Sequence, residues 1–407
     1  MSFEFIEGGT PTSVPGFLAA GVTAGFKRSG APDFAMICSE VPADFAGVFT
    51  SCTFAAAPVQ LCRQRVLNSP KLRAVIINSG NANACTGEQG MESARKSCEI
   101  AAQALNVSPE EVAVASTGRI GVQMDMSLIE KGVALSKAAL SVSGGADAAR
   151  AIMTTDTVPK AAAVKVKLSS GYVTIGAMSK GAGMIDPKLK VPHATMICVI
   201  TTDAIMPKEQ LQSLLASGAE DSFNRITVDG DMSTNDTVLI LANGNSGIAA
   251  APGSEDEKLF AAALTAVMQD LARRMVVDGE GSTKLVKIEV VNARTAEDAR
   301  KAAEAVGNSL LCKTAWFGND PNWGRVVAAL GYSGAEFVPE KCDIYFDSVK
   351  VVSRGGAAGV PEAELLDIVR KSDFIIRCDF NEGDAEYWVW SSDISYEYVK
   401  INADYHT

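Results

Sequence analysis

The chain has 407 residues, of which 47% are hydrophobic and 6% aromatic, and its formal net charge is −11. This length predicts two or three domains, or one large domain with an appendage, around a mainly aliphatic core. The negative charge argues against a nucleic-acid partner and is typical of a soluble cytoplasmic protein. No apolar run of about 18 residues occurs, so we expect no membrane span. The acidic N-terminus lacks the layout of a signal peptide.

Cysteine and histidine usage narrows the possible chemistry. The nine cysteines are scattered without a Cys-x-x-Cys spacing, which indicates small buried side chains in a reducing compartment rather than disulfides or metal ligands. Having only His193 and His406 excludes the two-histidine zinc motifs, and a Ser-His-Asp triad would need one of them. The stretch "GEGSTK" at 279–284 has the wrong spacing for a phosphate-binding loop. We therefore expect neither a metal nor a bound cofactor.

The first part of the chain alternates strand-like and helical segments. Residues 16–120 combine short apolar runs with a helical segment near 88–106, where alanine and leucine recur at helical spacing. Further helices are predicted over 127–141 and within 143–156. Residues 162–178 are typical of a hairpin, because two alternating runs are joined by Ser-Ser-Gly.

A continuously apolar run from Met196 to Ile200 predicts a strand that is covered on both faces. Helices are predicted over 207–216 and 257–278, with a polar loop and a strand between them. From about 284 the alternation of strands and helices, with 312–318 among the strands, predicts a second and smaller α/β domain. We therefore expect a catalytic domain at 1–283 and a C-terminal α/β domain at 284–407.

Two loops that follow strands expose small residues and backbone groups. In "NSGNANACTG" (78–87) the asparagines could bond their own backbone in a tight turn, or the loop could serve a site. In "ASTGRIG" (115–121) the Thr117 hydroxyl and the Gly118 N–H could direct two donors into one space, as an oxyanion hole requires. Strand-to-turn sequences of this kind are also common without any function.

Two charged residues stand in glycine-rich surroundings. Lys180 ends a predicted strand in front of a Gly-x-Gly turn, where a lysine is usually solvated but can also bind a substrate carboxylate. Glu280 lies between two glycines in "DGEGST" and could bind an amine or face solvent.

The stretch "VPHATMICVITTDA" (191–204) places Thr195 at the start of the apolar strand. The residue could simply be β-branched and suited to a strand. Alternatively, cleavage between Ala194 and Thr195 would leave an α-amino group, with a pKa of roughly 8, on the residue that carries the hydroxyl. That amine could act as the general base for the hydroxyl without any histidine.

Several of these loops belong to long motifs that are spread from one end of the chain to the other. They are "VPGFLAAGV", "AGVFTS", "AAPVQLCR", "NSGNANACTG", "VASTGRIG", "IMTTDTVPK", "KGAGMIDP", "ATMICVITTDA", "SFNRITVDGDMSTNDT", "DGEGSTK", "DPNWGR" and "YVKINADYHT". Together they resemble the ornithine acetyltransferases (glutamate N-acetyltransferases) of arginine biosynthesis. This resemblance implies a layered α/β/β/α sandwich of the aminopeptidase/ornithine acetyltransferase type, with a smaller C-terminal α/β domain.

The resemblance also implies an activity and a set of roles. The chain would cleave itself between Ala194 and Thr195 into an α chain (1–194) and a β chain, which assemble as α2β2. The threonine would take the acetyl group from N2-acetylornithine and pass it to glutamate by ping-pong chemistry, and acetyl-CoA is a co-substrate in bifunctional members. The implied site residues are the nucleophile Thr195, the oxyanion-hole pair Thr117 and Gly118, and the substrate contacts Thr154, Lys180, Thr195, Glu280, Asn402 and Thr407.

The sequence departs from the family pattern at two places. In the family the proline of the "KGAGMIDP" motif usually lies four residues before the threonine, whereas Pro187 and Thr195 are eight residues apart here. Arg119 follows the Ser-Thr-Gly motif, where an aliphatic residue is more usual. Two other functions stay open: an amidase or aminopeptidase with the same N-terminal threonine, and an uncleaved protein that serves binding or assembly.

Overall fold

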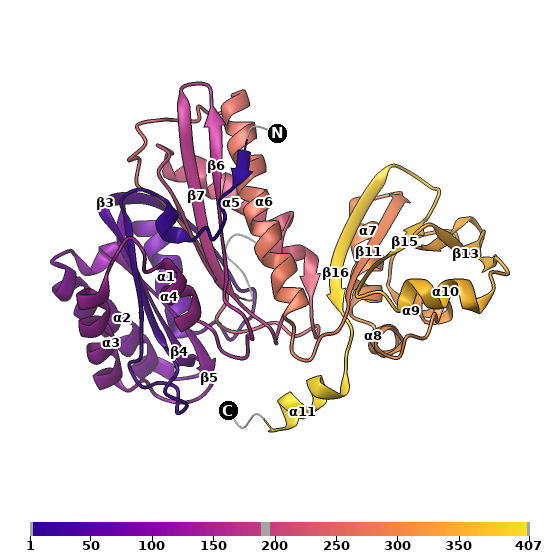
Figure 1. The fold of residues 1–407 in the computed structure, drawn as a ribbon, viewed down its shortest axis with the longest axis horizontal. Helices are drawn as coiled ribbons and strands as arrows, with labels where there is room; N and C mark the ends of the chain where they lie inside the picture. Colours follow the sequence, from indigo (N-terminus) through magenta and orange to yellow (C-terminus); the bar gives the residue numbers. More distant parts are fainter. Residues whose placement is uncertain (1–2, 189–195, 405–407) are drawn as a thin grey trace.

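The structure is a computed structural model that describes residues 3–188 and 196–404. Within these residues the strands form one sheet of nine and one of seven, which lie side by side (Figure 1). In the same part of the chain, no helix is long and apolar enough to cross a membrane.

The first sheet has the strand order β1-β6-β7-β8-β10-β3-β4-β5, with β2 paired to β3. Its strands are β1 (Phe3–Phe5), β2 (Phe17–Val22), β3 (Phe34–Phe49), β4 (Leu72–Asn81), β5 (Val112–Arg119), β6 (Lys160–Leu168), β7 (Gly171–Lys180), β8 (Ile197–Thr202) and β10 (Thr237–Ala242). The long strand β3 divides this sheet into two halves. Its first half pairs with β2 and β4, and its second half, from Asp44 to Phe49, pairs with β10.

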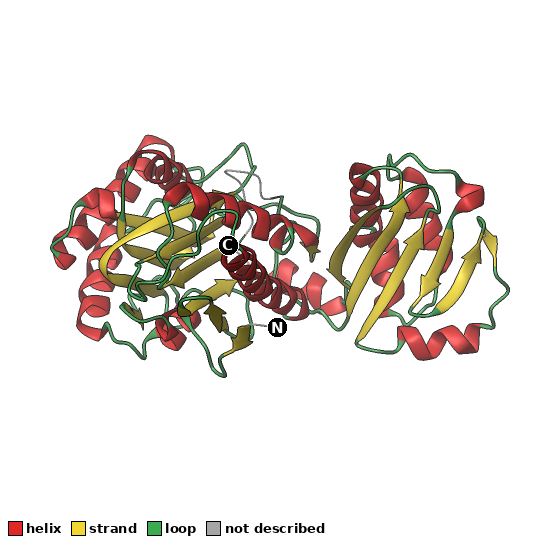
Figure 2. Cartoon of the chain, turned by 90° about the horizontal axis from the view of Figure 1, so that it is seen from above, coloured by secondary structure: helices red, strands yellow, loops and turns green. Residues whose placement is uncertain are grey.

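Alternating side chains fold these halves into a sandwich. Ile37 and Val75 of one half and Val199 and Leu239 of the other share a core cluster between the halves. Their sequence neighbours turn outward against helices. Each fully buried side chain of this kind stabilises the fold by roughly 1.5–3 kcal/mol. The result is the expected α/β/β/α layering, with helices outside strands (Figure 2).

The helices of this part cover both outer faces. α2 (Gly87–Leu105) and α3 (Met126–Ala139) pack on the half-sheet that contains β4 and β5, whereas α5 (Lys208–Glu220) and α6 (Glu255–Val277) pack on the other half. α1 (Ala57–Asn68) and α4 (Gly145–Ala151) contribute buried residues to the central layer. Short 3-10 helices occur at η1 (Pro11–Ser13), η2 (Pro109–Glu111), η3 (Phe223–Arg225) and η4 (Pro339–Lys341).

The second sheet has the order β14-β13-β12-β15-β11-β16-β9. Its strands are β9 (Ile226–Thr227), β11 (Leu285–Ala293), β12 (Asp343–Phe346), β13 (Val349–Ser353), β14 (Gly356–Ala357), β15 (Asp373–Asp379) and β16 (Ala385–Ser392). Its helices are α7 (Ala296–Gly307), α8 (Leu310–Phe317), α9 (Trp323–Tyr332) and α10 (Glu362–Val369). The chain then returns toward the first sheet through α11 (Tyr396–Asp404) (Figure 1).

Most expected elements are present, with two differences. Residues 312–318 do not form a strand: 312–317 belong to α8 and Gly318 is its C-cap, because Ser309 caps the start of the helix and Cys312 and Trp316 are buried one helical turn apart. Strand β9 precedes the expected boundary at 283, yet it pairs in parallel with β16 of the second sheet. The division into domains at 283 stays a prediction, since one edge strand of the second sheet comes from the first segment.

Candidate functional site

A cavity of about 350 Å³ lies where β7 ends and β8 and β10 begin. Its lining includes all the expected site residues that the structure describes, namely Thr117, Gly118, Thr154, Lys180, Glu280 and Asn402. Ala194, Thr195 and Thr407 lie outside the described residues. Met196, the residue after Thr195, lines the cavity. The fold therefore gathers at one place residues that are scattered through the sequence, although their roles stay predictions.

Strand register explains this convergence. Ile197 pairs with Lys180 of β7 on one side and with Thr237 of β10 on the other. The Thr237 N–H donates to the Met196 carbonyl at 2.5 Å. The chain therefore enters β8 directly between the end of β7 and the start of β10, which places Met196 beside Lys180.

The Thr117–Gly118 turn has a backbone that requires glycine. Gly118 has φ +127°, and a Cβ added there would lie 2.4 Å from the carbonyl carbon of Gly80. The Asn235 side-chain amide fixes the same turn by donating to the carbonyl oxygens of Ser116 at 2.8 Å and Ala82 at 2.5 Å. The oxyanion-hole candidate is thus held rigidly between the two half-sheets.

In the asparagine-rich stretch 78–87 the residues up to Asn81 belong to β4, and asparagine side chains bond the backbone of their own stretch. Asn81 Oδ1 accepts the Asn83 backbone N–H at 2.7 Å, and Asn78 Nδ2 donates to the Asn81 carbonyl at 2.7 Å. Within this loop Ala82 lines the cavity. The asparagines therefore shape the backbone beside the cavity.

Lys180 carries a buried charge without a paired carboxylate among the described residues. It is 8% exposed, and its Nζ donates to Thr117 Oγ1 at 3.3 Å. Burial lowers the pKa of this ammonium, whereas the negative charge of Asp156 opposes the shift. A buried cation that makes one long hydrogen bond is suited to bind an anionic group of a ligand.

Glu280 reaches the cavity from the loop between α6 and β11. Its backbone N–H donates to the Ala182 carbonyl at 2.8 Å, and its Oε2 accepts from Asn402 Nδ2 of α11 at 2.8 Å. A Cβ added at Gly183 would lie 2.4 Å from the Glu280 carboxyl. The glycine therefore makes room for this carboxylate, and α11 brings Asn402 to the cavity, where the resemblance places it.

Sequence reasoning missed several buried ionisable residues around the cavity. Asp236 lines it, and burial raises the pKa of this carboxyl well above its usual range. The Asp236 Oδ2 atom has no hydrogen-bond partner among the described residues. Lys160, Asp156 and Asp278 form a buried ion-pair group behind the cavity. The polar loop before β10 was a signal for Asp236, but nothing in its pattern singled out this residue.

Comparisons with known proteins agree on one family. A model of the ArgJ family matches residues 18–407. The "Arginine biosynthesis bifunctional protein ArgJ" of Symbiobacterium thermophilum is 48% identical over 99% of this chain and 100% of its own. The "Glutamate N-acetyltransferase" of Methanocaldococcus jannaschii is 46% identical over 95% of this chain and 98% of its own. A crystal structure of ornithine acetyltransferase complexed with ornithine, from Mycobacterium tuberculosis, is 42% identical over 46% of this chain and 100% of that chain, with a TM-score of 0.42.

Proposed function

We propose that this chain, which belongs to the ArgJ family, transfers the acetyl group of N2-acetylornithine to glutamate and releases ornithine and N-acetylglutamate. The observation that carries the proposal is the cavity at the start of β8. It combines Thr117 and Gly118, a buried lysine without a carboxylate partner in the described chain, and a carboxylate–amide pair. These groups suit an acylated amino acid with one anionic and one cationic end.

Self-cleavage would create the nucleophile. The Thr195 hydroxyl attacks the Ala194 carbonyl, the peptide nitrogen takes a proton and becomes the new α-amino group, and water hydrolyses the resulting ester. In the mature enzyme this amine takes the hydroxyl proton while Thr195 attacks the acetyl carbonyl. The leaving nitrogen of ornithine then receives a proton, and an acetyl ester remains on Thr195. Glutamate reverses the sequence when its amine attacks this ester.

The Thr117 hydroxyl and the Gly118 N–H would stabilise the oxyanion of each tetrahedral intermediate. The Thr117 oxygen accepts a hydrogen bond from Lys180 Nζ. Its own proton is therefore available to the substrate oxygen. Removing one donor of such a pair typically reduces kcat by roughly 100- to 1000-fold.

The charged residues would bind the ends of the substrate. Lys180 suits the α-carboxylate that both substrates share, with Thr154 beside it in the lining. Glu280 suits the side-chain ammonium of ornithine. With glutamate, the Glu280 carboxylate repels the side-chain carboxylate, whereas the Asn402 amide can donate to it. We therefore propose that Asn402 lets one cavity accept both side chains.

A Thr195→Ala variant tests the proposal. We expect it to stay a single 42.6 kDa chain in denatured mass measurements and to lose acetyl transfer, whereas the parent chain gives two fragments and transfers. Acetate release from N2-acetylornithine that is independent of glutamate would favour the amidase alternative instead. A parent chain that stays uncleaved and inactive would favour a binding or assembly role.

Two further features belong to the proposal. The cleaved chains would stay together as α2β2, which native mass measurement can check against a single αβ pair. Acetyl-CoA would serve as a second acetyl donor. Incubation with glutamate and acetyl-CoA, without N2-acetylornithine, should then form N-acetylglutamate. N-acetylglutamate formed only with N2-acetylornithine would restrict the enzyme to one donor.

A further inference from the structure

Lys160 is a buried lysine that touches the site without lining it. It begins β6, its side chain is 0% exposed, and it is absent from the cavity lining. Its Nζ donates to Asp156 Oδ1 at 2.7 Å and to Asp278 Oδ2 at 2.5 Å. Both carboxylates are buried as well, so the three charges form a desolvated ion-pair group.

Within this group, the Asp156 carboxylate holds one part of the cavity wall through hydrogen bonds to the backbone. Asp156 Oδ2 accepts the Thr154 backbone N–H at 3.0 Å, and Oδ1 accepts the Gly181 N–H at 2.7 Å. Thr154 and Gly181 both line the cavity, and Gly181 directly follows Lys180. One carboxylate therefore fixes the backbone on either side of the position proposed for the α-carboxylate of the substrate.

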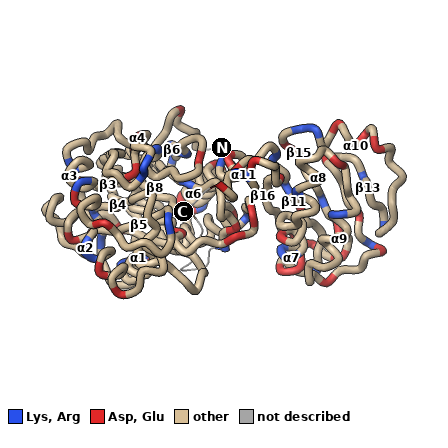
Figure 3. Tube along the Cα trace, turned by 90° about the horizontal axis from the view of Figure 1, so that it is seen from below, with Lys and Arg blue, Asp and Glu red and all other residues tan. Residues whose placement is uncertain are grey.

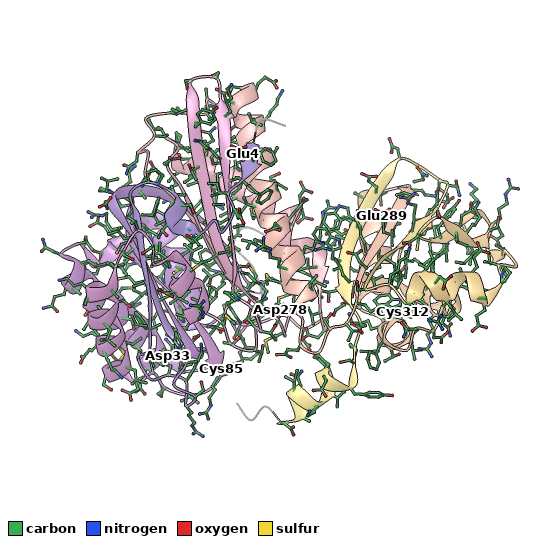
Figure 4. The ribbon with its side chains drawn as sticks, viewed as in Figure 1. Glu4, Asp33, Cys85, Asp278, Glu289 and Cys312 are labelled. Atoms are coloured by element: carbon green, nitrogen blue, oxygen red, sulfur yellow. The ribbon has the colours of Figure 1, made fainter. Side chains whose placement is uncertain are left out.

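The other carboxylate, Asp278, holds the part of the cavity wall that carries Glu280. Asp278 caps the C-terminal end of α6, two residues before Glu280, and Figure 4 shows it at the foot of that helix between the two sheets. Its carboxylate accepts the backbone N–H of Thr157 at 3.1 Å and also the Thr157 hydroxyl. The loop that carries Glu280 is thereby joined to the segment that carries Asp156.

We propose that Lys160 is a positioning residue, whose ammonium fixes the distance and the charge balance between the Lys180 wall and the Glu280 wall of the cavity. This inference rests on the proposed function, because it assumes that the two walls bind opposite ends of one amino acid. Lys160 touches neither substrate, and it acts through Asp156 and Asp278.

Electrostatics gives this role a signature that packing alone would not have. Burial raises the pKa of Asp156, but the charges of Lys180 and Lys160 outweigh this and lower it to about 2. Burial lowers the pKa of Lys180, and the charge of Lys160 lowers it further. The charged groups that act on Lys180 are Asp156, Lys160, Asp236, Glu280 and Lys27. Removing the Lys160 charge should therefore raise the pKa of Lys180.

The test is the pH dependence of the N2-acetylornithine reaction in a Lys160→Met variant, with rates expressed per cleaved chain. We expect KM to rise by about 10-fold or more, with a smaller fall in kcat, because the walls lose their fixed separation. The alkaline limb of kcat/KM should move to higher pH. In Lys160→Arg, which keeps the charge, the limb should stay in place whatever the steric effect on KM.

Lys313→Met is the matched control. Lys313 is also fully buried, but it lies in α8 and donates to Ser391 Oγ at 2.7 Å and to the Ser392 carbonyl at 2.5 Å, away from the cavity lining. It should change neither KM nor the limb. The inference is wrong if Lys160→Met leaves KM and the alkaline limb of kcat/KM unchanged, as Lys313→Met should. It is also wrong if both variants move that limb.

A second variant keeps the inference testable if Lys160→Met does not fold. Asp156→Asn removes the negative charge that raises the pKa of Lys180 most, so the alkaline limb of kcat/KM should move in the opposite direction, to lower pH. An unmoved limb in this variant would contradict the charge coupling. A parent chain that transfers no acetyl group at all would instead contradict the proposed function, which separates the two failures.

Discussion

Buried lysines are treated differently at the cavity and elsewhere in the molecule. In the second sheet, Lys284 Nζ donates to Asn319 Oδ1 and to the carbonyls of Val369 and Lys371. Lys313 is satisfied in the same way by a serine hydroxyl and backbone carbonyls. At the C-terminal end of β7 in the first sheet, Lys180 is also buried but makes one hydrogen bond to a described residue, at 3.3 Å. A cation that the fold leaves largely unsatisfied is the one that we expect a ligand to complete.

Carboxylates show the same contrast. Asp393, which follows β16, accepts from Thr283 N at 2.8 Å, Thr283 Oγ1 at 2.6 Å and Lys284 N at 2.9 Å. Asp236, in the cavity lining, has a buried oxygen without a partner in the described chain. Figure 3 shows that acidic and basic residues are interspersed over both parts, so exposed charge does not distinguish them. What sets the cavity apart is that Lys180 and Asp236, two of the ionisable groups in its lining, are incompletely hydrogen-bonded within the described chain.

Among the variants that test this comparison, Lys180→Met should have the largest effect. If the lysine binds the substrate carboxylate, kcat/KM for N2-acetylornithine should fall by about 10- to 100-fold or more, because a hydrogen bond to a charged group contributes about 1.5–3 kcal/mol. Steady-state kinetics measures the loss, and circular dichroism checks that the fold is kept. Unchanged kinetics in a folded variant would contradict the proposal that the incompletely hydrogen-bonded Lys180 binds the substrate.

Lys313→Met should have the reverse profile. Its loss leaves a buried hydroxyl and carbonyls without their donor, which costs about 1–3 kcal/mol of unfolding free energy. Activity per folded molecule should stay at the parent level. Thermal unfolding combined with kinetics at a temperature where both proteins are folded distinguishes these outcomes, and a selective loss of activity would contradict the contrast.

The pH dependence of stability tests the structural role of Lys313 in the second part of the molecule. Burial lowers the pKa of Lys313 to about 7 from its ordinary value of 10.5. Between these values the unfolded chain binds a proton that the folded chain does not, so stability gains from this site as the pH rises. The Tm difference between the parent and Lys313→Met should therefore grow from pH 7 to about pH 9. A difference that shrinks over this range would contradict the assignment.

The smallest effect is expected from Asp236→Asn. The raised pKa of this carboxyl means that the folded chain holds a proton which the unfolded chain releases above about pH 4. The parent should therefore lose stability with rising pH at this position, and the asparagine variant should lose less. Asp393→Asn, which breaks satisfied hydrogen bonds, should be less stable than the parent at every pH. Tm values across pH 5 to 8 compare the two.

The sequence was sufficient for the parts of the site that local motifs encode. Thr117, Gly118 and Lys180 stand beside glycines at strand ends, and Glu280 stands between two glycines, so the pattern alone marked these residues as candidates. Lys160 could not be found in this way, because its partner Asp278 lies 118 residues further along the chain. That ion pair exists only once α6 has packed on β6.

The two differences in the fold also have physical causes. Residues 312–318 are rich in residues that suit strands, but a serine cap and a buried tryptophan one turn after a buried cysteine favour the helix. Strand β9 has two residues and no periodicity, so its pairing with β16 is set by tertiary contacts alone. The four-layer arrangement was implied by family resemblance rather than by any local pattern.

Strand β9 precedes residue 283 in sequence but belongs to the second sheet, which limits how this protein can be divided into fragments. A fragment that begins at residue 284 would lack the two residues that pair with Trp390 and Ser391 of β16, and it would also lose the hydrogen bond from Tyr387 Oη to the Asn224 carbonyl. Its open edge would present unpaired backbone groups to other chains, which favours intermolecular strand addition. The two sheets are therefore interdependent in assembly, and a mutation that loosens residues 224–227 should promote aggregation through the C-terminal sheet.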